Sequence, residues 1–122
     1  MTPRSATAQL RTTDLARTIR FYTEVLGLEL VFQYEDFYAG LRAGEQMIHL
    51  KLVDAPDPSI AYVAAGGHLH LYLETDDAAA LAAAIEAKGV ALEKRVHDTP
   101  WGTREFILRD DQGHVIHCGQ QV

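Results

Sequence analysis

The chain has 122 residues, of which 48% are hydrophobic and 23% charged, and its formal net charge is −6 at pH 7. These values are typical of one globular domain, 1–122, and they exclude disordered and fibrous proteins. The negative charge argues against nucleic acid as a partner and favours a neutral or cationic small molecule. Without a signal-peptide pattern or an apolar run near the ~20 residues that span a membrane, we expect a cytoplasmic protein without a membrane partner.

The first half of the chain predicts one helix and four strands. A short strand pattern over 7–12 leads to Thr13 and Asp14, residue types that cap the N-terminus of a helix. Apolar residues then recur at helical spacing as far as Leu26, and Gly27 supplies the stop. Three further strand patterns follow this helix, separated by polar turns. They cover 28–34, 37–41 and 46–52. This half is therefore a βαβββ unit over about 6–53.

An irregular connector over about 54–66 precedes a strand of unusual composition. Pro56, Pro58 and a Gly-Gly pair, without a sustained period, mark the connector. The alternation over 68–73 then predicts a strand with His68, His70 and Tyr72 on one face and three leucines on the other. Imidazoles and a phenol in a row indicate either a lined cavity or a solvent-facing polar side.

The order of elements then repeats, which defines a second unit over about 67–120. Asp76 and Asp77 form the N-cap pair of an alanine-rich helix that ends at Gly89, and three strand patterns follow at 91–96, 104–108 and 114–119. Cys118 cannot form an intrachain disulfide, and because its strand is apolar we interpret it as a buried side chain.

The fold class that follows is α+β, with two tandem βαβββ units. One helix covers only one face of a four-stranded sheet. The other face is concave because sheets twist, so it must meet a second unit or hold a ligand. We expect the units to form a cup-shaped, partly open mixed β-sheet barrel with the helices outside.

Two parts of the chain resemble a known family, the vicinal oxygen chelate superfamily. It includes glyoxalase I, extradiol dioxygenases, fosfomycin-resistance enzymes and bleomycin-resistance proteins. The run from Asp14-Leu15 through Phe21-Tyr22 to Leu26-Gly27 is similar to the first-helix signature of the family. The segments 101–106 and 109–114 resemble its closing hairpin, although members usually have proline at 111 and often asparagine at 114. The resemblance covers nearly the whole chain and implies a small-molecule ligand and a homodimer.

The resemblance also implies a divalent metal, Zn, Ni, Fe or Mn, in a lyase, an isomerase or a dioxygenase. The metal-using members take ligands from the first and fourth strands of each unit, the first-strand ligand lying seven residues before the capping Asp. These positions hold Thr7, His49, His70 and His117 here. Neutral imidazole is a common ligand of such metals. Glu105 would be the base.

Several interpretations of the polar residues stay open. Gln9, two residues after Thr7, is a weak substitute ligand, and His68 competes with His70 because it faces the same way. The three histidines could instead line a cavity, hydrogen-bonded to each other or to a ligand. We interpret His97 and His114 as surface residues.

A metal-free function is the main alternative to the enzyme. Bleomycin-resistance proteins use the same cup to trap a large cationic aromatic drug, and the stretches 35–40 and 99–106 resemble theirs. The resemblance implies that Tyr38 and Trp101 are plates on which planar rings stack, although core packing is another interpretation of Trp101. A binding module with neither activity is a third possibility. The expected ligand-binding residues are Gln9, Tyr38, His68, Tyr72 and Trp101.

Overall fold

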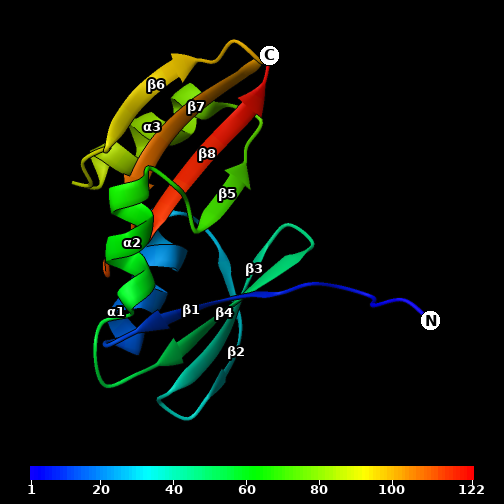
Figure 1. The fold of residues 1–122 in the computed structure, drawn as a ribbon, viewed down its shortest axis with the longest axis vertical. Coiled ribbons are helices and arrows are strands. Elements are labelled where there is room, and N and C mark those ends of the chain that lie inside the picture. The colour runs from blue at the N-terminus through cyan, green and yellow to red at the C-terminus, as the bar shows by residue number, and fades with distance from the viewer. The chain divides into compact units, whose positions relative to one another are not determined.

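The computed structural model describes all residues, 1–122, and they form two compact units, Met1–Asp57 and Pro58–Val122 (Figure 1). Each unit contains a four-stranded mixed sheet, with strand orders β1-β4-β3-β2 and β5-β8-β7-β6. This arrangement confirms the predicted α+β class and the two tandem βαβββ units. No helix combines the length and the apolar character that crossing a membrane requires.

The first unit is built on a parallel strand pair at one edge of its sheet. β1 runs parallel to β4, whereas the β4–β3 and β3–β2 pairs are antiparallel. The Asp14 carboxylate caps the helix that follows β1 by accepting a 3.1 Å hydrogen bond from the Arg17 N–H, and Gly27 ends this helical segment with φ of 76°. The elements are β1 (Ala8–Thr12), α1 (Leu15–Arg20), the π-helical turn η1 (Phe21–Val25), β2 (Glu29–Tyr34), β3 (Tyr38–Ala43) and β4 (Gln46–Leu52).

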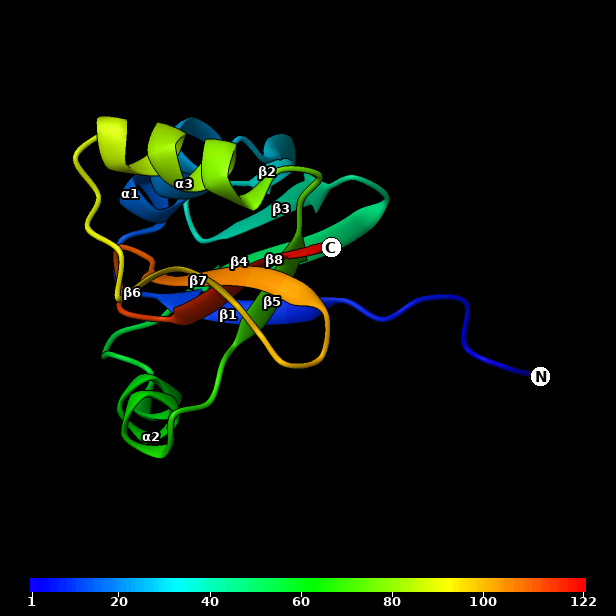
Figure 2. The ribbon, with the colours of Figure 1, turned by 90° about the horizontal axis from the view of Figure 1, so that it is seen from above.

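The second unit repeats this topology, with β5 parallel to β8 and the other pairs antiparallel. Figure 2 shows α3 along one face of this sheet and α2 on the other side of its strands, where α2 contacts β8. The buried side chains of α3 include Ala82 and Ile85, and Phe106, Leu108 and Cys118 are fully buried on the strands. The elements are α2 (Pro58–Gly66), β5 (Leu71–Glu74), α3 (Ala78–Ala87), β6 (Lys94–Asp98), β7 (Thr103–Arg109) and β8 (Val115–Gln121).

The predicted connector contains a helix that the sequence pattern does not reveal. Pro58 is the first residue of α2, where its missing N–H is not needed, and Gly67 follows the helix with φ of 67°. None of the side chains of α2 is buried. A helix without a buried face carries no apolar periodicity, so the prediction of an irregular segment was wrong.

The predicted polar strand over 68–73 begins three residues later, at Leu71. The main-chain N–H of His68 donates to the Val63 carbonyl, which ties His68 to the end of α2 rather than to the sheet. His70 lies in a bend and donates its main-chain N–H to the Val115 carbonyl. The expected row of His68, His70 and Tyr72 on one strand face is therefore wrong, and only Tyr72 lies on β5.

Candidate functional site

Three polar side chains share one face of the second sheet. Tyr72 of β5 is the register partner of His117 on β8, and Glu105 of β7 is the partner of Gly119 on β8. Directly paired residues point to the same face of a sheet, as do residues two apart on one strand. Tyr72, Glu105 and His117 therefore face away from the core, in which the alternate residues of β7 and β8 are buried.

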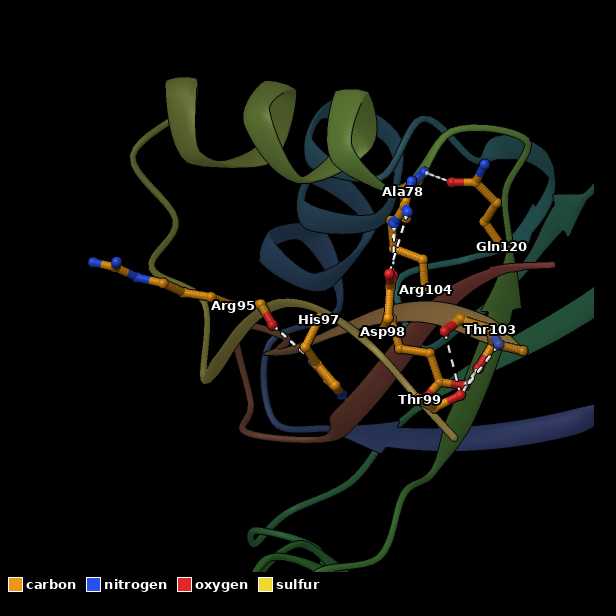
Figure 3. Close-up of polar contacts among 9 residues, drawn as sticks. Ala78, Arg95, His97, Asp98, Thr99, Thr103, Arg104 and Gln120 are labelled. Atoms are coloured by element: carbon orange, nitrogen blue, oxygen red, sulfur yellow. Dashed lines mark hydrogen bonds and ion pairs between the residues drawn. The ribbon is translucent and has the colours of Figure 1, made fainter. Parts of the chain in front are cut away.

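Tyr72 and Glu105 form a hydrogen-bonded pair on this face. The phenol Oη donates to Glu105 Oε2 over 2.8 Å, and Thr103 Oγ1 donates to the same carboxylate oxygen over 2.9 Å. Thr103 is in turn 2.7 Å from Thr99 Oγ1, a contact drawn in Figure 3. Partial burial of the phenol and its hydrogen bond to Glu105 raise the pKa of Tyr72 to about 12. Glu105 itself is only 8% exposed.

An open pocket of about 300 Å³ lies beside the Tyr72–Glu105 pair, at the carboxyl ends of the parallel strands β5 and β8. Two carboxylates line it and no lysine, arginine or histidine does, so its lining carries only negative charge. Gln120 anchors one side, because its Oε1 accepts a 2.8 Å hydrogen bond from the Ala78 N–H at the start of α3 (Figure 3). The lining residues are Tyr72, Glu74, Thr75, Asp76, Thr103, Gly119, Gln120 and Gln121.

Trp101 lies at the same end of the second sheet as the pocket. It belongs to the turn between β6 and β7, two residues before Thr103, and the Val122 N–H donates to the carbonyl of the adjacent Gly102 over 3.0 Å. Its side chain is 72% exposed. The interpretation of Trp101 as a core residue is therefore wrong, and the indole is available to a ligand.

His117 is half-buried on the pocket-bearing face of the sheet. Burial lowers its pKa, and the charge of nearby Glu105 opposes this effect only in part. The imidazole is therefore neutral at pH 7.

The ring of His70 is occupied on both nitrogens. Nδ1 accepts a 3.0 Å hydrogen bond from the Val115 N–H, so the ring proton is on Nε2, which lies 3.2 Å from Ser59 Oγ. A metal ligand needs a free lone pair, and the only lone pair of this neutral ring is already used. His70 as it is placed does not fit the role of a ligand.

The first unit carries a separate cluster of rings around His49. Tyr38 Oη is 2.8 Å from His49 Nδ1, and the Gln9 side-chain amide donates to the same Oη over 3.1 Å. The Phe32 ring stacks on Tyr38 at 6.3 Å between centroids and meets His49 edge-on at 5.4 Å. Phe32 lies over Gly40, where an added Cβ would come within 2.6 Å of Phe32 Cδ2. Hydrogen bonds thus join Gln9, Tyr38 and His49 into one cluster, and the Phe32 ring packs against its two rings.

The predicted metal ligands fall in different units. His49 lies in the first unit, and His70 and His117 lie in the second. Within either unit, no three His, Cys, Asp or Glu side chains come close enough to hold a metal ion. With His70 also committed to hydrogen bonds, the donor set does not fit a three-histidine centre in either unit, and that centre stays a prediction.

Of the remaining histidines, His114 and His68 differ from their expected positions, whereas His97 is partly exposed at a strand end. His114 was interpreted as a surface residue, but its ring is fully buried and lies edge-on to His70 at 4.8 Å. The His114 ring can be buried because the Asp110 carboxylate, in the turn before β8, is its hydrogen-bond partner, with Oδ2 2.8 Å from His114 Nδ1. His97 is half-buried, and its Nδ1 donates to the Arg95 carbonyl over 2.8 Å (Figure 3). His68 is exposed and lies outside the pocket lining.

Of the residues that line the pocket, only Tyr72 belongs to the sequence-based set, and Glu74, Thr75, Asp76, Gln120 and Gln121 are absent from it together with Thr103 and Gly119. Thr103 precedes Glu105 by two residues and Gly119 follows His117 by two, so strand alternation puts each on the face of a residue already singled out. That alternation is the signal that identifies them.

Comparisons with known proteins agree on one fold. The family model described as Glyoxalase/Bleomycin resistance protein/Dioxygenase superfamily matches residues 4–118. The chain is similar to the bleomycin-binding protein from bleomycin-producing Streptomyces verticillus, solved with copper(II)-bleomycin, at 23% identity and a TM-score of 0.72, covering 100% of this chain and 99% of that one. It is also similar to a lactoylglutathione lyase from Agrobacterium tumefaciens, at 24% identity and a TM-score of 0.72, with coverages of 97% and 94%. TioX from Micromonospora sp. ML1 matches at 20% identity and a TM-score of 0.76, with coverages of 97% and 96%. No curated protein matches the chain significantly.

Proposed function

Because the chain belongs to the glyoxalase/bleomycin resistance protein/dioxygenase superfamily, we propose that it binds a cationic aromatic small molecule without a metal and so sequesters it. The observation that carries this proposal is the second-unit pocket, which has an acidic lining and an exposed tryptophan at the same end of the sheet. The superfamily includes both enzymes and binding proteins, so the choice depends on the chemistry of this site.

The charges of the pocket favour a positive ligand. Glu74 and Asp76 line it, and Glu105 lies behind Tyr72 without a lysine or arginine partner. An anion entering this pocket would meet the carboxylates of Glu74 and Asp76 and no lysine, arginine or histidine in the lining. A volume of about 300 Å³ is at the small end for ligand pockets, so it suits a charged arm rather than a whole drug.

The aromatic residues supply the surface for a planar ring. Trp101 is 72% exposed and Tyr72 is 41% exposed, so both present ring faces without first leaving a core. Stacking on such rings contributes about 0.5–1.5 kcal/mol beyond the burial of area. In the first unit, Tyr38 is half-buried and held by Gln9 and His49, which makes it a pre-oriented ring for stacking.

Trp101 is the only tryptophan, so its fluorescence reports on ligand binding directly. We expect bleomycin and the planar cation proflavine to quench it, with a dissociation constant for proflavine about tenfold lower than for neutral acridine, which corresponds to about 1.4 kcal/mol. Acridine-9-carboxylate should bind most weakly. Calorimetry checks the affinities, with Trp101→Phe as the test variant and Tyr62→Ala, a change of an exposed ring on α2, as the control. Equal affinity for the three acridines would contradict the proposal.

A divalent-metal enzyme of the lyase, isomerase or dioxygenase type is the second candidate, and the neutral His117 beside the Glu105 carboxylate favours it. His117 would be one member of the donor set of such a site, and Glu105 is the base that the family resemblance implies. His70 would first have to give up its bonds to Val115 and Ser59. Elemental analysis of protein purified without chelator decides this point. Stoichiometric metal that is lost in His117→Ala supports the enzyme, and metal-free wild-type protein contradicts it.

We also propose a homodimer, as the family resemblance implies. Exposed side chains of β2, including Phe32 at 40% and Tyr34 at 60%, provide apolar surface for such a contact. Size-exclusion chromatography with light scattering measures the mass. A monomer at all concentrations would contradict the dimer.

A further inference from the structure

Gly119 lies directly beneath the ring of Tyr72. A Cβ atom added at this glycine would overlap the phenol oxygen and would come within 2.6 Å of Tyr72 Cζ and 3.3 Å of Glu105 Cγ. Gly119 does not have a positive φ, so an alanine could adopt its backbone conformation. The glycine therefore supplies space for another side chain rather than conformational freedom.

The space matters because of the strand order. Tyr72 is on β5 and Glu105 is on β7, and β8 lies between these two strands. Strands in a sheet are about 4.8 Å apart, so the phenol must cross the whole width of β8 to reach the carboxylate. Gly119 is the point on β8 opposite Glu105, where the ring crosses. A side chain there would block the only direct path.

The contact with Tyr72 also decides which carboxylate oxygen is left for a ligand. Oε2 of Glu105 accepts from both Tyr72 and Thr103, whereas no hydrogen bond within the chain reaches Oε1. Glu105 is only 8% exposed, and its carboxylate forms no salt bridge with a lysine or an arginine. A buried carboxylate that lacks a counter-charge favours a positively charged donor at its remaining oxygen.

We propose that Gly119 is a positioning residue of the second-unit pocket: it seats the Tyr72 phenol against Glu105 and thereby leaves Glu105 Oε1 to receive the positive group of the ligand. This inference rests on the proposed binding function and names its charged contact, an organic cation with N–H donors. Glu74 and Asp76 then form the outer rim of the pocket and attract the cation without fixing its orientation.

The first experiment tests the seating of Tyr72 without a ligand. In ¹³C-tyrosine NMR spectra recorded about one pH unit above the ordinary tyrosine pKa of about 10, Tyr72 of the wild type stays protonated. Tyr72→Phe identifies its signal. In Gly119→Ala the signal should shift to the ionised position, because the displaced phenol loses Glu105. An unchanged titration of Tyr72 in this variant would overturn the proposal.

The second experiment separates displacement of the ring from a general folding defect. If the new methyl group destabilises the protein by colliding with Tyr72, Gly119→Ala should cost no stability when Tyr72→Ala is already present. Thermal midpoints of the two single variants and the double variant measure this coupling. Gly66→Ala is the matched control, because the atoms nearest its added Cβ belong to the exposed ring of His68, which can turn into solvent. Additive losses from Gly119→Ala and Tyr72→Ala would refute the steric explanation.

The third experiment measures the consequence for binding, with proflavine as the probe. Gly119→Ala and Glu105→Gln should each weaken proflavine binding about tenfold, the loss expected for one charge-assisted hydrogen bond, whereas Gly66→Ala should not. If wild-type protein binds no proflavine, the proposed function fails, and the NMR titration still decides the seating of Tyr72. If Gly119→Ala displaces Tyr72 but binds proflavine as the wild type does, the positioning role is overturned and the binding function stands.

Discussion

Replacement of Asp110 by alanine should be among the most destabilising single changes in the second unit. Asp110 is 7% exposed and begins the turn before β8. Its Oδ1 accepts from the main-chain N–H groups of Gln112, Gly113 and His114 over 3.0, 3.0 and 2.9 Å. Its Oδ2 takes the Nδ1–H of the fully buried His114 over 2.8 Å. One carboxylate thus satisfies four donors.

The cost follows from which donors remain buried after the change. Gln112 and Gly113 are partly exposed, so water can replace the carboxylate at their N–H groups. The main-chain N–H and the ring Nδ1–H of His114 cannot reach water, and each buried donor left unpaired costs about 1–3 kcal/mol. We therefore expect Asp110→Ala to lower the free energy of unfolding by about 4 kcal/mol. Asp110→Asn keeps Oδ1 and its three main-chain bonds, so its cost should be about 1–2 kcal/mol.

Urea unfolding followed by circular dichroism gives both numbers from the midpoint and the slope. Asp54→Ala is the control, because Asp54 is exposed and its loss should change the free energy of unfolding by less than about 0.5 kcal/mol. A cost below about 1 kcal/mol for Asp110→Ala, or an equal cost for alanine and asparagine, would refute the reasoning about buried donors.

Three further predictions concern other parts of the two sheets. The Cys118 thiol is fully buried, and burial raises its pKa to about 12. Thiol reagents at pH 8 should therefore label it only as fast as the protein unfolds. The free energy of unfolding should fall as the pH rises from about 9 towards 12, because the unfolded chain releases the thiol proton first. Labelling as fast as a free thiol would contradict this burial. Gly40→Ala should expel the Phe32 ring and cost about 1–3 kcal/mol by urea unfolding, and a much smaller loss when Phe32→Ala is already present would confirm the collision. Asp77→Ala removes the cap that accepts the Ala80 N–H over 3.0 Å and should cost about 1 kcal/mol; no change in the thermal midpoint would argue against the cap.

The repeated fold could be predicted because its signals are local. Asp14 and Asp77 cap their helices as expected, and Gly27 and Gly89 end the helical segments with φ of 76° and 87°. Cap chemistry and strand alternation depend on residues a few positions apart, which a sequence displays directly. The helix α2 has no buried side chain and so shows no such pattern.

The site could be predicted only in part, because its contacts are not local. Glu105 and Tyr72 were both singled out, but their 2.8 Å contact depends on the order β5-β8-β7, which brings together residues 33 positions apart. His70 was chosen by its spacing from Asp77, and spacing does not show that Val115 and Ser59 already occupy both ring nitrogens. The burial of His114 depends on Asp110, a hydrogen-bond partner whose effect exceeds the ordinary preference of histidine for the surface.

In both sheets an aromatic ring from an edge strand lies over a glycine of the neighbouring strand, Phe32 over Gly40 and Tyr72 over Gly119. Such a pair makes the two positions epistatic, since a larger residue at the glycine is harmful until the ring becomes smaller. New ligand preferences on these faces would then arise through paired substitutions. The order of the two matters, because the aromatic residue must be replaced by a smaller one before the glycine can be replaced by a larger one. A directed-evolution library that varies one position at a time would miss them, whereas one that randomises residues 72 and 119 jointly would reach them.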